Sequence, residues 1–177
     1  MPPQEKMQKF KFTCSRCGQV HEGSPSFGYS SPHQYDELND EEKSKIASLS
    51  EDFCEIRHPD QTDRFIRVVL EVPINGVEEP FLWGVWVSLS ETNFEKYREN
   101  FKNETYEDSY FGWFCNRLPY YPNTLSLKSR AIVKPGKQRP KLELEPTDHP
   151  LAEDCQNGIA WEKVVEIVQV ARHGKEA

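Results

Sequence analysis

Alternation of apolar and polar residues along the chain predicts a sheet of about five strands. Two of these segments, Arg64 to Ile74 and Pro80 to Leu89, flank the pair Asn75-Gly76, which suits a tight turn. They are therefore expected to form an antiparallel hairpin. The other strands are separated by turns that contain proline. Their predicted ranges are Tyr110 to Leu118, Thr124 to Val133 and Lys141 to Glu145.

Capping residues and apolar residues three or four positions apart predict helices between these strands. In the second helix Phe94, Tyr97 and Phe101 share one face, which is expected to cover the sheet. Gly174 is expected to end the last helix, and the segment from Ser24 to Tyr35 reads as an ordered loop. The predicted helices run from Asn39 or Asp40 to about Leu49, from Ser90 to Phe101, and from about Ala160 to His173.

Neighbouring strands joined by short turns favour an α+β fold. We expect a mostly antiparallel sheet with two to three helices packed on it. The sequence has no internal repeat and no long linker, so residues 1–177 are expected to form a single domain. Within it, residues of about 9–35 form an N-terminal hook, and residues of about 36–173 form the sheet and helices.

Composition and charge narrow the class of protein. Hydrophobic residues make up 36% and aromatic residues 12%, which is enough to build a core. The formal net charge of -7 makes nucleic acid an unlikely partner, because the summed field repels a polyanion. No apolar run is long enough to span a membrane, and the first twelve residues are polar. We therefore expect a cytoplasmic protein with no membrane partner.

The cysteines point to free thiols or to thiolates on a metal. Their number is odd, and only the first two lie close together, which is not typical of a secreted disulfide framework. The five residues are Cys14, Cys17, Cys54, Cys115 and Cys155.

A possible zinc site begins at Cys14-x-x-Cys17-Gly18, a zinc-ribbon-like turn that follows the short strand Lys9 to Thr13. This motif is half of a tetrahedral site, and a second Cys-x-x-Cys pair is absent. His21 and Cys54 are the candidate third and fourth ligands, with His58 as another possibility. A turn without metal, or a buried pair of reduced thiols, explains the motif as well. A redox role is less favoured, because the residues after Gly18 continue like a hairpin and not like a helix.

An aromatic strand offers a second candidate site. Residues 81–86 are apolar on both faces, which is typical of a central buried strand. Alternatively, Gly84 opens a groove beside Trp86 for a small molecule or a peptide. The predicted groove residues are Trp83, Trp86, Trp113, Tyr121 and His149.

Two further hypotheses are weaker. Asp148 and His149 could orient an imidazole toward Cys115 or Cys155 for hydrolase chemistry, although Pro150 biases His149 toward an extended turn. A basic stretch from residue 128 to residue 141 could bind phosphate or a nucleic-acid backbone, or could be a solvated hairpin. Its members are Lys128, Arg130, Lys134, Lys137, Arg139 and Lys141.

Four motifs together carry a family resemblance. They are Cys14-x-x-Cys17-Gly18-x-x-His21, the run from Trp83 to Ser90, Phe111-Gly112-Trp113 with Leu118-Pro119-x-Tyr121, and Asp148-His149-Pro150-Leu151. In order and spacing the chain resembles the mostly bacterial domain of unknown function family 2199, from about Phe12 to about Ala171. The resemblance implies one domain and assigns no catalytic residue. The leading hypothesis is therefore an uncharacterised binding or interaction module with a possible structural zinc site, and the sequence leaves open whether it is an enzyme.

Overall fold

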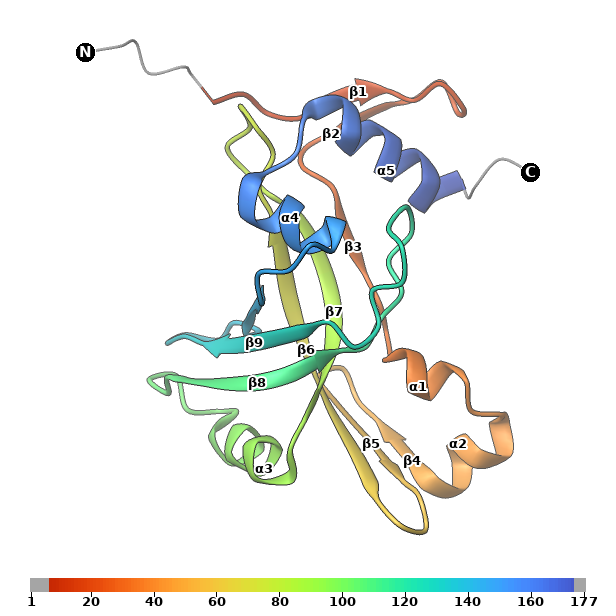
Figure 1. Cartoon of the computed structure of the whole chain (residues 1–177), viewed down its shortest axis with the longest axis vertical. Helices are drawn as coiled ribbons and strands as arrows, with labels where there is room; N and C mark the ends of the chain where they lie inside the picture. The colour runs from red at the N-terminus through yellow and green to blue at the C-terminus, as the bar shows by residue number, and fades with distance from the viewer. Residues whose placement is uncertain (1–6, 174–177) are drawn as a thin grey trace.

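The computed structural model describes residues 7–173 and contains ten strands and five helices within them (Figure 1). The strands are β1 (Lys11–Thr13), β2 (Val20–Glu22), β3 (Ser26–Gly28), β4 (Ala47–Leu49), β5 (Phe53–Arg57), β6 (Thr62–Val72), β7 (Phe81–Leu89), β8 (Asp108–Phe114), β9 (Lys128–Val133) and β10 (Lys141–Leu144). The helices are α1 (His33–Asp36), α2 (Asp40–Ile46), α3 (Glu91–Asn100), α4 (Pro150–Asn157) and α5 (Trp161–His173).

Strands β6 to β10 form a closed five-stranded barrel. Each strand pairs with the next along the chain in antiparallel fashion, and β10 then pairs with β6. That closing pair is parallel, with Lys141 opposite Val69. The direction follows from the count: in a run of antiparallel neighbours, the first and fifth strands point the same way. The mixed α/β class is confirmed, whereas a mostly antiparallel sheet describes this closed barrel only loosely.

The extra strands extend the barrel because β6 and β7 are longer than the strands that close it. On β6, residues 62–66 pair with β5 and residues 69–70 pair with β10. On β7, residues 82–84 pair with β3 and residues 87–88 pair with β8. The β6–β7 hairpin therefore belongs both to the barrel and to the extension formed by β3, β4 and β5, and β8 and β9 run across it in Figure 1. Strands β1 and β2 form a separate two-stranded hairpin.

Several local predictions are confirmed. The β6–β7 hairpin is antiparallel and turns at Asn75-Gly76, where Gly76 has a φ of 76°. Asn39 caps α2 and accepts a hydrogen bond from the Glu42 amide at 2.8 Å, as its short polar side chain favours. Ser90 caps α3 in the same way through the Asn93 amide.

Other local predictions were wrong in the bounds or the type of an element, and one helix was missed. The helix expected to reach Leu49 ends at Ile46, because residues 47–49 pair with β5 as strand β4. The segment expected to be a loop contains β3 and α1. Helix α4 was not expected; His149 caps it and Pro150 occupies its first turn, where proline needs no amide partner. The predicted helix stop at Gly174 lies outside the described residues.

The buried side chains form two hydrophobic clusters. The larger fills the barrel and continues into α4 and α5, so it includes Val85 of β7 and Ile167 of α5. The smaller lies on the other face of β5, β6 and β7. Its buried members are Cys54, Ile56, Phe65, Trp86 and Cys115. The two clusters follow from the alternation of β7, whose faces are both apolar.

The first and last described segments lie side by side. Helix α5 packs along the β1–β2 hairpin at one end of the molecule, while β4, β5, α1 and α2 lie at the other end (Figure 1). Phe10 contacts Trp161 with ring centroids 4.7 Å apart. Within residues 7–173, no helix is long and apolar enough to cross a bilayer.

Candidate metal centre

The turn between β1 and β2 holds the first two cysteines. The Gly18 amide donates to the Cys14 carbonyl at 2.9 Å, and the Cys14 amide donates to the Gln19 carbonyl at 2.9 Å. Gly18 has a φ of 70°, a conformation that glycine adopts without steric cost. These bonds curl the chain so that both cysteine side chains lie at the tip of the hairpin.

Helix α5 brings a third ligand to this tip. Its position is fixed by packing of Val168 in the barrel core, by the Phe10–Trp161 contact, and by a hydrogen bond of 3.0 Å from Gln169 to Ser15. The last residue of α5, His173, then lies beside Cys14, with its Nε2 atom 3.3 Å from the Cys14 Sγ atom.

Among residues 7–173, Cys14, Cys17 and His173 form a group whose ligand atoms all lie within 4.8 Å of one another. In a tetrahedral zinc site, metal–ligand bonds of roughly 2.0–2.3 Å place neighbouring ligand atoms roughly 3.3–3.8 Å apart. The observed spacing is compatible with such a site after small side-chain movements. The group can therefore bind a metal ion.

The environment of Cys14 favours the thiolate that metal binding requires. Its side chain is 2% exposed, and burial alone would keep it protonated. The backbone amide of Cys17 donates to the sulfur and outweighs this burial, with further donation from the Arg16 amide and from the side chains of Cys17 and His173. Together these donors lower the pKa of Cys14 to about 6.

His21 lies next to this group. Its Nε2 atom is 3.6 Å from the Cys17 Sγ atom, and its ring lies 5.2 Å from the ring of Phe12. It comes from β2, four residues after Cys17, as the Cys-x-x-Cys-x-x-x-His spacing suggested. His21 therefore contacts one member of the group without being within 4.8 Å of all three.

The structure does not bring Cys54 or His58 to the metal group. Cys54 is buried in the smaller cluster on β5, at the opposite end of the molecule from the hook (Figure 1). His58 pairs with Asp63 at 3.2 Å. His173 occupies the place expected for Cys54. Its residue type and its position on the last helix were visible in the sequence, but its contact with a residue 159 positions away depends on how α5 docks.

The predicted aromatic groove is not assembled as a surface around Gly84. Trp83 lies in the barrel core, and Trp86 lies in the smaller cluster, where its Nε1 atom donates to the Tyr29 carbonyl at 2.9 Å. A Cβ atom on Gly84 would lie 3.4 Å from the Cα atom of Gly28. The glycine thus admits the backbone of β3, which fills the space assigned to a ligand.

The other three groove residues lie apart from these tryptophans. Trp113 is exposed on β8, near the Lys128 ammonium group. The Tyr121 hydroxyl donates to Asp154 at 2.6 Å. His149 holds the start of α4, because its Nδ1 atom accepts the Leu151 amide at 3.0 Å.

The imidazole of His149, which was proposed for hydrolase chemistry, is already bound to the backbone through both of its nitrogens. While Nδ1 of His149 accepts the Leu151 amide, Nε2 lies 3.0 Å from the Asn123 carbonyl, to which it donates. Both ring nitrogens are thus bound to backbone groups, and neither has a cysteine sulfur as its partner among the described residues. Burial raises the pKa of Cys115 to about 11 and that of Cys155 to about 12. These thiols are poor nucleophiles at neutral pH.

The basic stretch is partly neutralised by acids from other parts of the chain. Lys137 pairs with Glu104 at 3.2 Å, and Arg139 pairs with Asp52 at 2.9 Å. Lys141 of β10 pairs with Glu71 of β6 at 3.2 Å. The stretch contains no acidic residue of its own, but acids from elsewhere in the fold make its surface less positive than the sequence suggested.

Together these features define a class: a five-stranded barrel protein whose N-terminal cysteine hook and C-terminal helix share a metal-capable group. The chain belongs to the family of uncharacterized proteins conserved in bacteria, DUF2199, whose family model matches residues 13–159. This confirms the resemblance inferred from the motifs, and the match includes both cysteines of the hook. No curated protein and no solved structure matches the chain.

Proposed function

We propose that the protein is a cytoplasmic binding module whose two ends are held together by a structural zinc ion. Cys14, Cys17 and His173 are the first three ligands, and His21 is the fourth. The observation that supports this proposal is the convergence of the three ligand atoms within 4.8 Å from two segments far apart in the sequence. The partner of the module is an unidentified protein or small molecule.

The ligand chemistry favours zinc. Two thiolates and two imidazoles form one of the common tetrahedral sets for structural zinc, and hard cations such as magnesium prefer oxygen ligands. Backbone amides that donate to a cysteine sulfur, as those of Cys17 and Arg16 do to Cys14, stabilise the negative charge that a metal would otherwise have to induce. His21 completes the set through a side-chain movement toward its neighbour Cys17.

In this proposal the zinc ion works as a clasp. Helix α5 covers part of the barrel core, and its side chains Val164, Ile167 and Val168 are buried there. Zinc at the last turn of α5 fixes this helix to the β1–β2 hairpin. The ion has no open coordination position and takes no part in a reaction, which agrees with an interaction module.

The first experiment measures the zinc content of the untagged, purified protein by elemental analysis. We expect about one zinc per chain, the ordinary occupancy of a structural site. The Cys14→Ser variant should lose it. Cys54→Ser is the matched control, because it changes a buried cysteine outside the site and should retain the metal.

Replacing zinc with cobalt tests the identity of the ligands. Two thiolates and two imidazoles around cobalt give an absorption spectrum that changes when one ligand is removed, so Cys17→Ser, which removes a thiolate, and His173→Gln, which removes an imidazole, should each alter it. A protein that contains no zinc and takes up no cobalt would contradict the proposal and favour a pair of reduced thiols. If the His173→Gln variant retained zinc, α5 would not supply a ligand to the site.

A further inference from the structure

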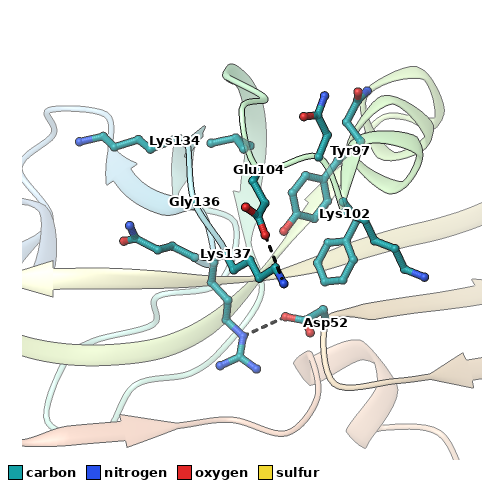
Figure 2. A pocket seen from close by; sticks show the side chains of 13 residues that line it. Asp52, Tyr97, Lys102, Glu104, Lys134, Gly136 and Lys137 are labelled. Atoms are coloured by element: carbon teal, nitrogen blue, oxygen red, sulfur yellow. Dashed lines mark hydrogen bonds and ion pairs between the residues drawn. The ribbon is translucent and has the colours of Figure 1, made fainter.

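A cavity of about 620 Å³ lies where the end of α3 meets the loop between β9 and β10. Its size falls in the usual range for small-molecule sites. Figure 2 shows side chains from three separate parts of the chain around it. The lining includes Asp52, Tyr97, Phe101, Glu104, Lys137 and Arg139.

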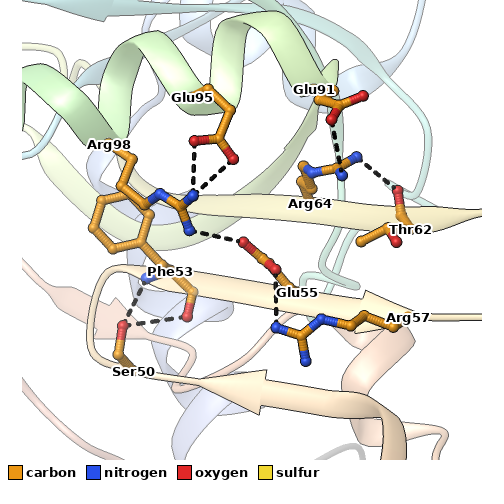
Figure 3. A network of polar contacts seen from close by, with 9 residues as sticks. All are labelled: Ser50, Phe53, Glu55, Arg57, Thr62, Arg64, Glu91, Glu95 and Arg98. Carbon is orange, nitrogen blue, oxygen red and sulfur yellow. Dashed lines mark hydrogen bonds and ion pairs between the residues drawn. The ribbon is translucent and has the colours of Figure 1, made fainter.

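Helix α3 forms one wall and is firmly held (Figure 3). Arg98 bridges Glu95 of its own helix at 2.7 Å and Glu55 of β5 at 3.1 Å. Arg64 of β6 lies 3.5 Å from Glu91 at the start of α3. These ion pairs join the helix to the sheet, while Phe94 packs in the barrel core. The helix is therefore held in place, and the residues at its end line the cavity in fixed positions.

Tyr97 directs a hydrogen-bond donor toward the cavity. Its side chain is 3% exposed overall, and its hydroxyl oxygen is not one of the fully buried polar atoms that lack a partner among residues 7–173. Figure 2 shows this hydroxyl directed into the cavity. Burial raises the pKa of Tyr97, so the hydroxyl remains a donor at neutral pH. An acceptor oxygen of a ligand in the cavity can replace water as the partner of this hydroxyl.

The charges of the lining favour an anionic acceptor. The lining contains four cationic side chains and two carboxylates, which is an excess of two positive charges. The cations are Lys102, Lys134, Lys137 and Arg139, and the carboxylates are Asp52 and Glu104. The Lys137–Glu104 pair crosses the cavity in Figure 2 and is exposed. Such pairs contribute little to stability, so an anion can displace Glu104 and bind Lys137.

Phe101 adds an apolar surface beside these charges. Its ring is 44% exposed, although it was expected to lie against the sheet with Phe94 and Tyr97. It meets Phe53 edge-on with centroids 5.0 Å apart, and it meets Tyr97 edge-on at 5.7 Å. The ring is held by these contacts on one side and is open on the other, where a flat ring could pack against it.

We infer that this cavity binds a small organic anion in which a phosphate or carboxylate group lies next to a flat ring. The anionic oxygens bind Lys137 and Arg139 and accept the Tyr97 hydroxyl, while the ring packs on Phe101. The inference identifies a ligand class for the binding module proposed above. It does not depend on the zinc ion.

Calorimetric titration of the full-length protein with four simple probes tests the ligand class. Phenyl phosphate and benzoate carry both a ring and an anion, inorganic phosphate carries only the anion, and benzyl alcohol carries only the ring. We expect saturable binding of at least one of the first two, at least about tenfold tighter than either single-feature probe. The better of the two identifies the anionic group. Equal or absent binding of all four would overturn the inference.

Matched variants test the site itself. Tyr97→Phe removes only the hydroxyl and should weaken binding of the preferred probe about fivefold. Arg139→Gln should weaken it at least about tenfold. Arg130→Gln is the control, because Arg130 belongs to the same basic stretch, carries the same charge and does not line the cavity. Equal losses in Arg130→Gln and Arg139→Gln would mean that net charge alone attracts the probe, and would overturn the site.

The same titration separates this inference from the zinc proposal. The Cys14→Ser protein should bind the preferred probe as the unchanged protein does, because the hook does not line the cavity. If zinc is absent and probe binding persists, only the zinc proposal fails. If zinc is present and no probe binds, only the cavity inference fails.

Discussion

The hook and the smaller hydrophobic cluster both contain buried cysteines, yet they affect the thiol in opposite directions. Cys14, Cys54 and Cys115 are all between 0% and 2% exposed. The pKa of Cys14 is lowered to about 6, whereas burial raises that of Cys54 to about 12 and that of Cys115 to about 11. Exposure therefore does not decide whether a thiolate forms.

The difference lies in the balance between burial of each sulfur and the hydrogen bonds donated to it. The Cys14 side chain folds back over its own turn, where the amides of Cys17 and Arg16 donate to it. At Cys115 burial is the largest effect, and it outweighs the donors to the sulfur, which are the side chains of Ser88 and Gln34 and the backbone of Ser88. At Cys14 the donation from the Cys17 amide is larger than the effect of burial, so the thiolate is favoured.

Metal removal should produce the largest contrast between the two regions. After chelation, hydrogen exchange of the β1–β2 and α5 amides should accelerate by at least about a hundredfold, because the clasp no longer holds them. Exchange in β6 and β7 should change by no more than about threefold. Mass spectrometry of peptic fragments measures both. Equal acceleration in the barrel would show that hook and barrel unfold as one unit.

Truncation of a core side chain should show the reverse contrast. Phe65→Ala removes a fully buried ring from the smaller cluster and should lower the free energy of unfolding by about 3–5 kcal/mol. Val20→Ala changes an exposed hook residue and should have an effect within about 0.5 kcal/mol. Urea unfolding measures both values. A loss below about 1 kcal/mol for Phe65→Ala would mean that the smaller cluster is not part of the cooperative core.

Alkaline pH should weaken the smaller cluster through Cys115. The folded protein retains this thiol proton up to a pKa of about 11, whereas the unfolded chain releases it near 9.0. Between these values the unfolded state binds fewer protons, so stability is full below pH 9 and falls as pH rises through 11. The expected loss is roughly 1–3 kcal/mol. Urea midpoints from pH 8 to pH 11 test it, and Cys115→Ala should reduce the slope.

Conservative replacement of single cysteines in the metal-free protein should give the smallest contrast. Cys54→Ser places a hydroxyl among apolar side chains and should cost about 1–2 kcal/mol. Cys17→Ser, at an exposed position, should change stability by less than about 0.5 kcal/mol. Thermal unfolding compares the two. A larger cost for Cys17→Ser without metal would show that the hook thiols stabilise the fold by themselves.

Local patterns predicted the elements that depend on neighbouring residues. The alternation of residues 64–72 and the Asn75-Gly76 turn predicted the β6–β7 hairpin, and Ser90 predicted the start of α3. Closure of the barrel could not be read in the same way. It depends on two residue pairs between β10 and β6, for example Leu142 opposite Leu70, and short parallel pairing leaves no separate sequence pattern.

In the candidate metal group, too, the residues that lie close together in the sequence could be predicted and the distant one could not. Cys14, Cys17 and His21 share one turn, so their spacing was informative. His173 reaches Cys14 only because apolar residues of α5 dock on the barrel and carry its last turn to the hook. Cys54 was a reasonable alternative by residue type. Its alternation with Ile56 within β5 already indicated a core position, because both side chains point to the same buried face.

The meeting of Cys14 with His173 has a mechanical consequence. A pulling force applied at these two residues would pass directly across the clasp, and the chain between them, which spans 159 positions, would carry no load while the clasp holds. With metal bound, rupture would begin with the breaking of metal–thiolate bonds. Without it, the same force would peel α5 from the hairpin and reach the barrel strands at once.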